Sequence, residues 1–96
     1  MMAGSMHIEI IYWDLEEEPD GNVQHIAEHD ISIEEFEEVV LNPGNAVVES
    51  HSSDNLITFG HTSTGKHIAA VWELVSDDPR AIRPVTAFET PPKRRR

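Results

Sequence analysis

The chain opens with alternating apolar and polar residues, changes to helical spacing, and then returns to alternation for its second half. In residues 7–13, Ile8, Ile10 and Tyr12 share one face, and this period of two predicts a β-strand. Four further stretches of strand type follow the helical region, at residues 46–49, 56–61, 67–75 and 81–88. Pro84 lies inside the last stretch and cannot donate a ladder hydrogen bond, so we expect a sheet edge or a bulge there.

Two helices are predicted between the first strand and the second. Residues 22–29 carry a narrow apolar stripe, with Asp20 or Asn22 available as the N-cap. Asp30 follows, and we expect it to end this helix in left-handed backbone, which Asp tolerates better than most residues. Ser32 and Glu35 have the S-x-x-E spacing of a capping box, which predicts that a second helix begins there and runs to the Pro-Gly turn after residue 41.

The predicted order is therefore β-α-α-β-β-β-β. This order indicates an α+β fold in which an antiparallel sheet carries two N-terminal helices on one face. We expect one domain over residues 7–90, preceded by a start and cloning remnant over residues 1–6. Residues 91–96 are expected to form a disordered basic tail.

Charge is distributed very unevenly along the chain. There are 18 acidic and 7 basic residues, and four of the basic ones are the final Lys93-Arg94-Arg95-Arg96. The remaining three bases against 18 acids give residues 1–92 a net charge of −15. Such a body repels nucleic-acid phosphates, which proteins bind mainly through Lys and Arg. It is compatible with a basic protein partner, or with solubility alone.

The absence of certain residues and segments excludes several classes. There is no cysteine, which excludes disulfides, thiolate nucleophiles and cysteine zinc sites. No apolar run approaches the roughly 18 residues that a membrane span needs, and no secretion signal begins the chain. We therefore expect a cytoplasmic protein without a membrane partner.

Residues 25–29, His-Ile-Ala-Glu-His, match the H-x-x-E-H zinc signature of one class of metalloprotease. On a helix, His25 and His29 would share a face and could hold one metal ion. A catalytic zinc also needs a third protein ligand and a walled cleft, for which this short chain has little room. The simpler interpretation is structural, with His29 at a helix end and His25 hydrogen-bonded to a neighbouring strand. We expect no cofactor, and the pair of histidines is the alternative metal site.

Several motifs occur in a recognisable order. They are Trp13-Asp14 after the first strand, the helix-end His29, Ser32-Ile33-Glu34-Glu35 opening the second helix, Gly60-His61-Thr62-Ser63-Thr64-Gly65-Lys66 between two strands, and Arg83 in the last strand. With the element order, this pattern resembles the BrnT family of bacterial toxins, whose fold is related to RelE-type ribonucleases. The chain departs from the family pattern at four places, where Glu28, Asp30, Phe88 and Pro91-Pro92 replace a Lys, a Gly, an Arg and a Glu-Arg pair.

The resemblance implies the toxin half of a type II toxin–antitoxin pair, with a ribbon-helix-helix antitoxin as partner and RNA as substrate. Metal-independent RNA cleavage needs a base, an acid and a cation for the phosphate. His29, Lys66 and Arg83 are the first candidate catalytic residues, and His61 and His67 follow them. The alternative is a non-catalytic acidic module that docks a basic protein partner. A homodimer is compatible with either function. Convergence of Lys66, Arg83 and His29 in one pocket would favour the ribonuclease.

Overall fold

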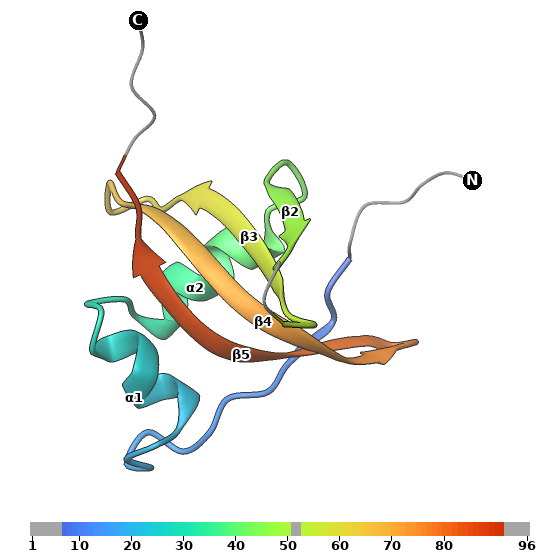
Figure 1. Ribbon diagram of the computed structural model, residues 1–96, viewed down its shortest axis with the longest axis horizontal. Helices are drawn as coiled ribbons and strands as arrows, with labels where there is room; N and C mark the ends of the chain where they lie inside the picture. The colour runs from blue at the N-terminus through green and yellow to red at the C-terminus, as the bar shows by residue number, and fades with distance from the viewer. Residues whose placement is uncertain (1–6, 51–52, 92–96) are drawn as a thin grey trace, which may run out of the picture.

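The computed structural model describes residues 7–50 and 53–91, which form five strands and two helices. In chain order these are β1 (Ile10–Ile11), α1 (Asn22–Ala27), α2 (Ile33–Leu41), β2 (Ala46–Glu49), β3 (Leu56–His61), β4 (His67–Asp77) and β5 (Arg80–Glu89). The strands make one sheet in the order β1-β5-β4-β3-β2 (Figure 1). The predicted α+β class and both helices are confirmed. The predictions for residues 1–6, and for the tail beyond Pro91, concern residues outside the described ranges.

The sheet is mixed, which corrects the predicted antiparallel sheet. The strands β2, β3, β4 and β5 pair antiparallel, but β1 runs parallel to β5, with Ile10 opposite Ala81 and Ile11 opposite Ile82. The alternation of side chains in a strand says which residues share a face, but it says nothing about the direction of a neighbour far along the chain. The sequence pattern therefore does not predict the direction of β1.

The first strand is also shorter than predicted, and its inward residues differ. Ile8 is buried, whereas Ile10 and Tyr12 are exposed and Ile11 and Trp13 pack against the core. The prediction that Ile8, Ile10 and Tyr12 share the buried face is therefore correct for Ile8 and wrong for Ile10 and Tyr12. The break in alternation falls between Ile8 and Ile11, at the start of the two-residue strand, and from Ile11 to Trp13 the period of two holds on the other face.

The core lies between the helices and one face of the sheet. Its largest fully buried side chains include Trp72 from β4 and Phe36 from α2. Trp72 Nε1 donates a hydrogen bond of 2.9 Å to Thr58 Oγ1, so the indole has a partner although it is removed from water. Trp13 packs edge-on against Phe36, with ring centroids 5.3 Å apart, and this contact holds the segment after β1 to α2.

The two helices begin in different ways. Ser32 Oγ accepts the Glu35 N–H at 3.1 Å and Glu35 Oε1 accepts the Ser32 N–H at 3.0 Å, so the predicted capping box of α2 is confirmed. The N-cap of α1 is Gly21, which makes no side-chain cap, and neither Asp20 nor Asn22 takes that place. The left-handed conformation expected for Asp30 is confirmed by its φ of 64°. However, α1 already ends at Ala27, two residues earlier than predicted.

The bulge expected at Pro84 is present in β5. Trp72 lies opposite Pro84 and Val71 opposite Thr86, so Val85 has no counterpart on β4. Because β1 pairs only with the start of β5, the rest of that edge lies beside α1, where the Pro84 carbonyl oxygen accepts a 3.0 Å hydrogen bond from Asn22 Nδ2. A helix at this edge blocks further strand pairing. Neither described helix has the length and apolar character that a membrane span requires.

Candidate functional site

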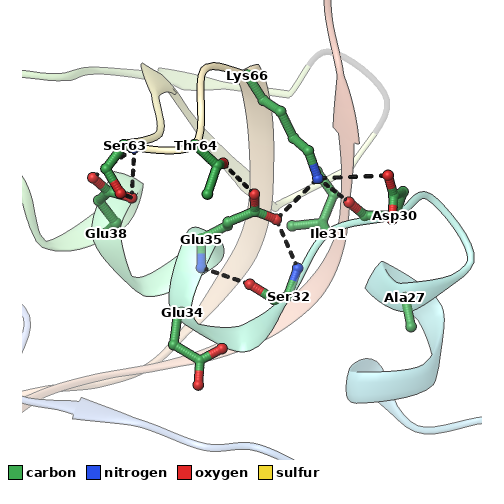
Figure 2. Close-up of a pocket in the computed structure, with 10 residues that line it drawn as sticks. All are labelled: Ala27, Asp30, Ile31, Ser32, Glu34, Glu35, Glu38, Ser63, Thr64 and Lys66. Atoms are coloured by element: carbon green, nitrogen blue, oxygen red, sulfur yellow. Dashed lines mark hydrogen bonds and ion pairs between the residues drawn. The ribbon is translucent and has the colours of Figure 1, made fainter.

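Among the predicted site residues, Lys66 contacts two carboxylates and one backbone carbonyl oxygen. It ends the turn between β3 and β4, and its ammonium group lies 3.2 Å from Glu35 Oε1 and 3.7 Å from Asp30 Oδ2 (Figure 2). The same ammonium donates to the backbone carbonyl oxygen of Asp30. The left-handed conformation of Asp30 and the capping box of α2 thus place both acceptors beside Lys66. These contacts fix the β3–β4 turn to the start of α2.

An open pocket of about 430 Å³ lies beside this ion pair, at the N-terminal end of α2. Four carboxylates line it, from Asp30, Glu34, Glu35 and Glu38. Most of them have partners within the protein. Thr64 Oγ1 donates to Glu35 Oε2, and Glu38 accepts hydrogen bonds of 2.8 and 2.9 Å from the Ser63 N–H (Figure 2). Hydrogen bonds across the pocket therefore join the β3–β4 turn to α2. The four carboxylates outnumber the single cation, Lys66, so the lining carries a net negative charge.

The charges in this network are mutually stabilised. Burial by itself raises the pKa of Glu35, but hydrogen bonds from Thr64, Ser32 and Lys66 outweigh it, so the pKa lies below its ordinary value of 4.5. Partial burial likewise lowers the pKa of Lys66, but the negative charge and hydrogen bond of Glu35 outweigh it, so the pKa lies above 10.5. Both groups are ionised at neutral pH. Lys66 therefore cannot act there as a neutral general base.

Arg83 lies in a second, separate cluster. Its guanidinium donates two hydrogen bonds of 3.0 Å to the two carboxylate oxygens of Asp14, the bidentate geometry that Arg favours. Glu73, opposite Arg83 on β4, lies 3.9 Å from Arg83 Nε. Hydrogen bonds from the backbone N–H of Asn22 and from Arg83 hold the pKa of Asp14 below its ordinary value. Arg83 is thus held by two carboxylates.

Lys66 and Arg83 do not converge. Lys66 precedes β4, while Arg83 pairs with Glu73, seven residues further along. At about 3.3 Å per residue, roughly 23 Å of strand separates the two positions. The pocket beside Lys66 is not lined by Arg83, and the two pockets described beside Arg83 are not lined by Lys66. The arrangement that would have favoured a ribonuclease centred on Lys66, Arg83 and His29 is therefore absent from the described residues.

The histidines form a looser group. His61 and His67 lie opposite each other across β3 and β4, with ring centroids 4.6 Å apart, and His67 Nδ1 is 2.5 Å from Thr90 Oγ1. The ring of His29 packs edge-on against Phe88 at 6.4 Å. His61 and His67 are therefore a close pair, separate from the Arg83 cluster.

The H-x-x-E-H stretch does not lie on one helix. α1 ends at Ala27, so His29 belongs to the following turn, and His25 Nδ1 lies 3.4 Å from the carbonyl oxygen of Val85. The contact of His25 with a neighbouring strand agrees with the structural interpretation. Within residues 7–50 and 53–91, no group of three or more His, Asp or Glu side chains is arranged to hold a metal ion.

Two important residues carry no clear signal in the sequence. Asn22 is 3% exposed and its side chain bonds to two segments, the one after β1 and β5, whereas the pattern indicates only a helix cap. Asp14 is the partner of Arg83, which lies 69 residues away. The Trp13-Asp14 motif marked Asp14, but no spacing rule connects it to Arg83.

No family model, curated protein or solved structure matches this chain. The resemblance to the BrnT family thus stays a prediction that rests on the motifs and on the order of the elements.

Proposed function

We propose that this protein is a non-catalytic acidic module that docks a basic segment of a partner protein. The observation that carries the proposal is the pairing of its cations. Lys66 is paired with Glu35, Arg80 with Asp77 at 3.0 Å, and Arg83 with Asp14 at 3.0 Å. These three are all the Lys and Arg side chains of residues 7–50 and 53–91. The described body therefore offers a phosphate no cation that is not already bound to a carboxylate.

The excess of carboxylates faces solvent. The segment before α1 exposes Glu16, Glu17, Glu18 and Asp20, and α2 exposes Glu34 beside the pocket. These side chains belong to the 18 acids that give residues 1–92 a net charge of −15. A field of one sign attracts a partner of opposite charge and raises its rate of association. It acts against the approach of RNA, whose backbone is negative.

The test is a titration of the full chain with a labelled Lys-rich peptide, followed by fluorescence anisotropy. We expect saturable binding at about 50 mM salt that weakens at least about tenfold at about 300 mM, because the Debye length shortens. A Glu-rich peptide of equal length is the matched control and should not bind. Neutralising Glu16, Glu17 and Glu18 together to Gln should weaken binding of the Lys-rich peptide. Equal binding of both peptides, or none at low salt, would contradict the proposal.

A toxin-type ribonuclease is the second candidate, favoured by the close pair His61 and His67. Two imidazoles in contact could serve as general base and general acid near neutral pH. The experiment is degradation of RNA by the purified protein, with and without a metal chelator. Cleavage that resists the chelator and is lost in His61→Asn/His67→Asn would establish this function in place of the first. A Lys66→Ala/Arg83→Ala protein, assayed beside it, tests the two separated cations.

A further inference from the structure

One face of the sheet carries no helix within the described residues. Ile68, Ala70 and Trp72 of β4 point into the core with the helices, so the alternate residues Ala69 and Val71 point to the opposite face. Figure 1 looks onto this opposite face, with α2 lying behind β3 and β4. We call it the open face. The register of β2, β3, β4 and β5 identifies the side chains that lie on the open face.

Two apolar rows cross the open face. In the first, Phe59, Ala69 and Phe88 lie opposite one another on β3, β4 and β5. In the second, Val48, Ile57 and Val71 lie opposite one another on β2, β3 and β4. Phe88 is 40% exposed and Val48 is 43% exposed, while Ala69, between the two phenylalanines, is fully buried. Large apolar side chains on adjacent strands thus form one continuous exposed surface.

Polar pairs bound this surface at both ends. His61 and His67 follow the first row at one end of β4, and Glu73 and Arg83 follow the second row towards the other end. A contiguous apolar surface with a polar rim is the usual form of an interaction site on a soluble protein. The exposed Leu15, by contrast, lies outside the strands, in the segment between β1 and α1.

We propose that the open face is the surface that receives the basic partner, and that the partner presents an amphipathic helix with an apolar stripe and flanking Lys or Arg residues. This inference rests on the proposed function. Four strands spaced about 4.8 Å apart give a surface roughly 14 Å wide, which accommodates one helix about 10 Å in diameter. The helix buries its stripe on the two apolar rows, and its basic flanks meet the acidic body.

The net charge of the protein favours one kind of partner over the others that could cover this surface. Residues 1–92 carry −15, so a second copy would bring two strongly negative bodies together, and RNA would be repelled in the same way. A basic helix is attracted by this charge and also has an apolar stripe to bury. The combination of an apolar surface with a net negative charge of the body therefore selects a basic amphipathic segment.

The experiment uses a synthetic peptide of about 18 residues, built from Leu and Lys with the leucines on one helical face. A scrambled peptide of the same composition has no apolar face and is the control. We expect the amphipathic peptide to bind the full chain at least about tenfold more tightly in calorimetry. In ¹⁵N spectra we expect its addition to shift amides of β3, β4 and β5 around Phe59, Ala69 and Phe88.

The variants are Phe88→Ser and Val48→Ser, which lie on different strands of the open face, with Leu15→Ser as the matched control. Leu15 is also exposed and apolar, at 68%, but lies before α1. We expect each open-face variant to weaken binding of the amphipathic peptide several-fold and Leu15→Ser to leave it unchanged. Two positions keep the test decisive if circular dichroism shows that one of the variants fails to fold.

Three outcomes would overturn the inference. Equal binding of the amphipathic and scrambled peptides, with shifts away from the open face, would leave the acidic docking function standing and remove this surface from it. Absence of binding by either peptide would overturn the docking function as well. A dimer in analytical ultracentrifugation that Phe88→Ser converts to monomer would assign the open face to a second copy of the chain.

Discussion

Asn22 joins the start of α1 to the segment after β1 and to β5. Its Nδ2 donates to the carbonyl oxygens of Tyr12 at 3.1 Å and Pro84 at 3.0 Å, and its Oδ1 accepts the Asp14 N–H at 2.8 Å. The side chain is buried, and the bond to Pro84 is made away from water, while those to Tyr12 and Asp14 are partly buried. Loss of a partner from such a group leaves a buried carbonyl or N–H unsatisfied, which costs about 1–3 kcal/mol.

We expect Asn22→Asp to destabilise the protein by about 2–3 kcal/mol at pH 7, although the two side chains have the same shape. The carboxylate would place negative oxygens against the Tyr12 and Pro84 carbonyls, where the amide now donates. The deficit should shrink at acidic pH, because a protonated carboxyl can again donate one hydrogen bond. Urea unfolding at pH 7 and at about pH 4 measures both effects. An equal deficit at the two pH values would show that carbonyl repulsion is not the cause.

The ion pair of Glu35 with Lys66 predicts a pH dependence whose sign follows from the lowered pKa of Glu35. A lowered pKa in the folded state stabilises the protein above the ordinary value of 4.5, and this contribution is lost as pH falls through the folded value. Glu35→Gln keeps the oxygen that accepts from Ser32 but removes the charge. We expect it to lower Tm by a few degrees at pH 7, with a gap to wild type that closes below pH 4.5. A gap that does not shrink at all as pH falls below 4.5 would contradict this account.

At the scale of the elements, α2 depends on its first turn. It has nine residues, fewer than an isolated helix needs, so capping and packing must supply its stability. Ser32→Ala removes the oxygen that accepts the Glu35 N–H, and we expect a loss of about 0.5–2 kcal/mol in the free energy of unfolding. Ser32→Thr retains that oxygen and is the control, for which we expect most of the stability to return. Equal losses in the two variants would indicate a packing defect at residue 32.

The contrast between α2 and β1 shows what the sequence pattern can predict. The capping box and the alternation in β3 and β4 are local, so Ser32, Glu35 and Trp72 could be placed from their neighbours in the chain. The direction of β1 depends on β5, some 70 residues later, and no local pattern contains it. The same holds for the candidate site. The side-chain chemistry of Lys66, Arg83 and His29 suits a catalytic site. Whether these side chains converge, however, depends on strand register and on ion pairs with carboxylates such as Asp14.

At the scale of the whole molecule, charge should govern stability as well as binding. The full chain carries −11 at pH 7, and like charges oppose compaction. We expect Tm to rise as NaCl increases from about 10 mM to about 200 mM, where the Debye length falls from about 30 Å to about 7 Å. Glu16→Gln/Glu17→Gln/Glu18→Gln removes three negative charges, so its Tm should depend less on salt. A Tm that falls with salt would mean that ion pairs such as Lys66–Glu35 outweigh the repulsion.

The parallel pairing of β1 with β5 also bears on the order in which the protein can be made. β1 leaves the ribosome before β5, and its pairing partner, residues 81–82, is synthesised some 70 residues later. Ile8, Ile11 and Trp13 therefore have no native sheet edge to join while the intervening residues emerge. A segment of this kind exposes apolar surface until the last strand arrives. The time needed to translate the residues between β1 and β5 thus sets how long the segment around β1 remains open to chaperones or to mispairing with other chains.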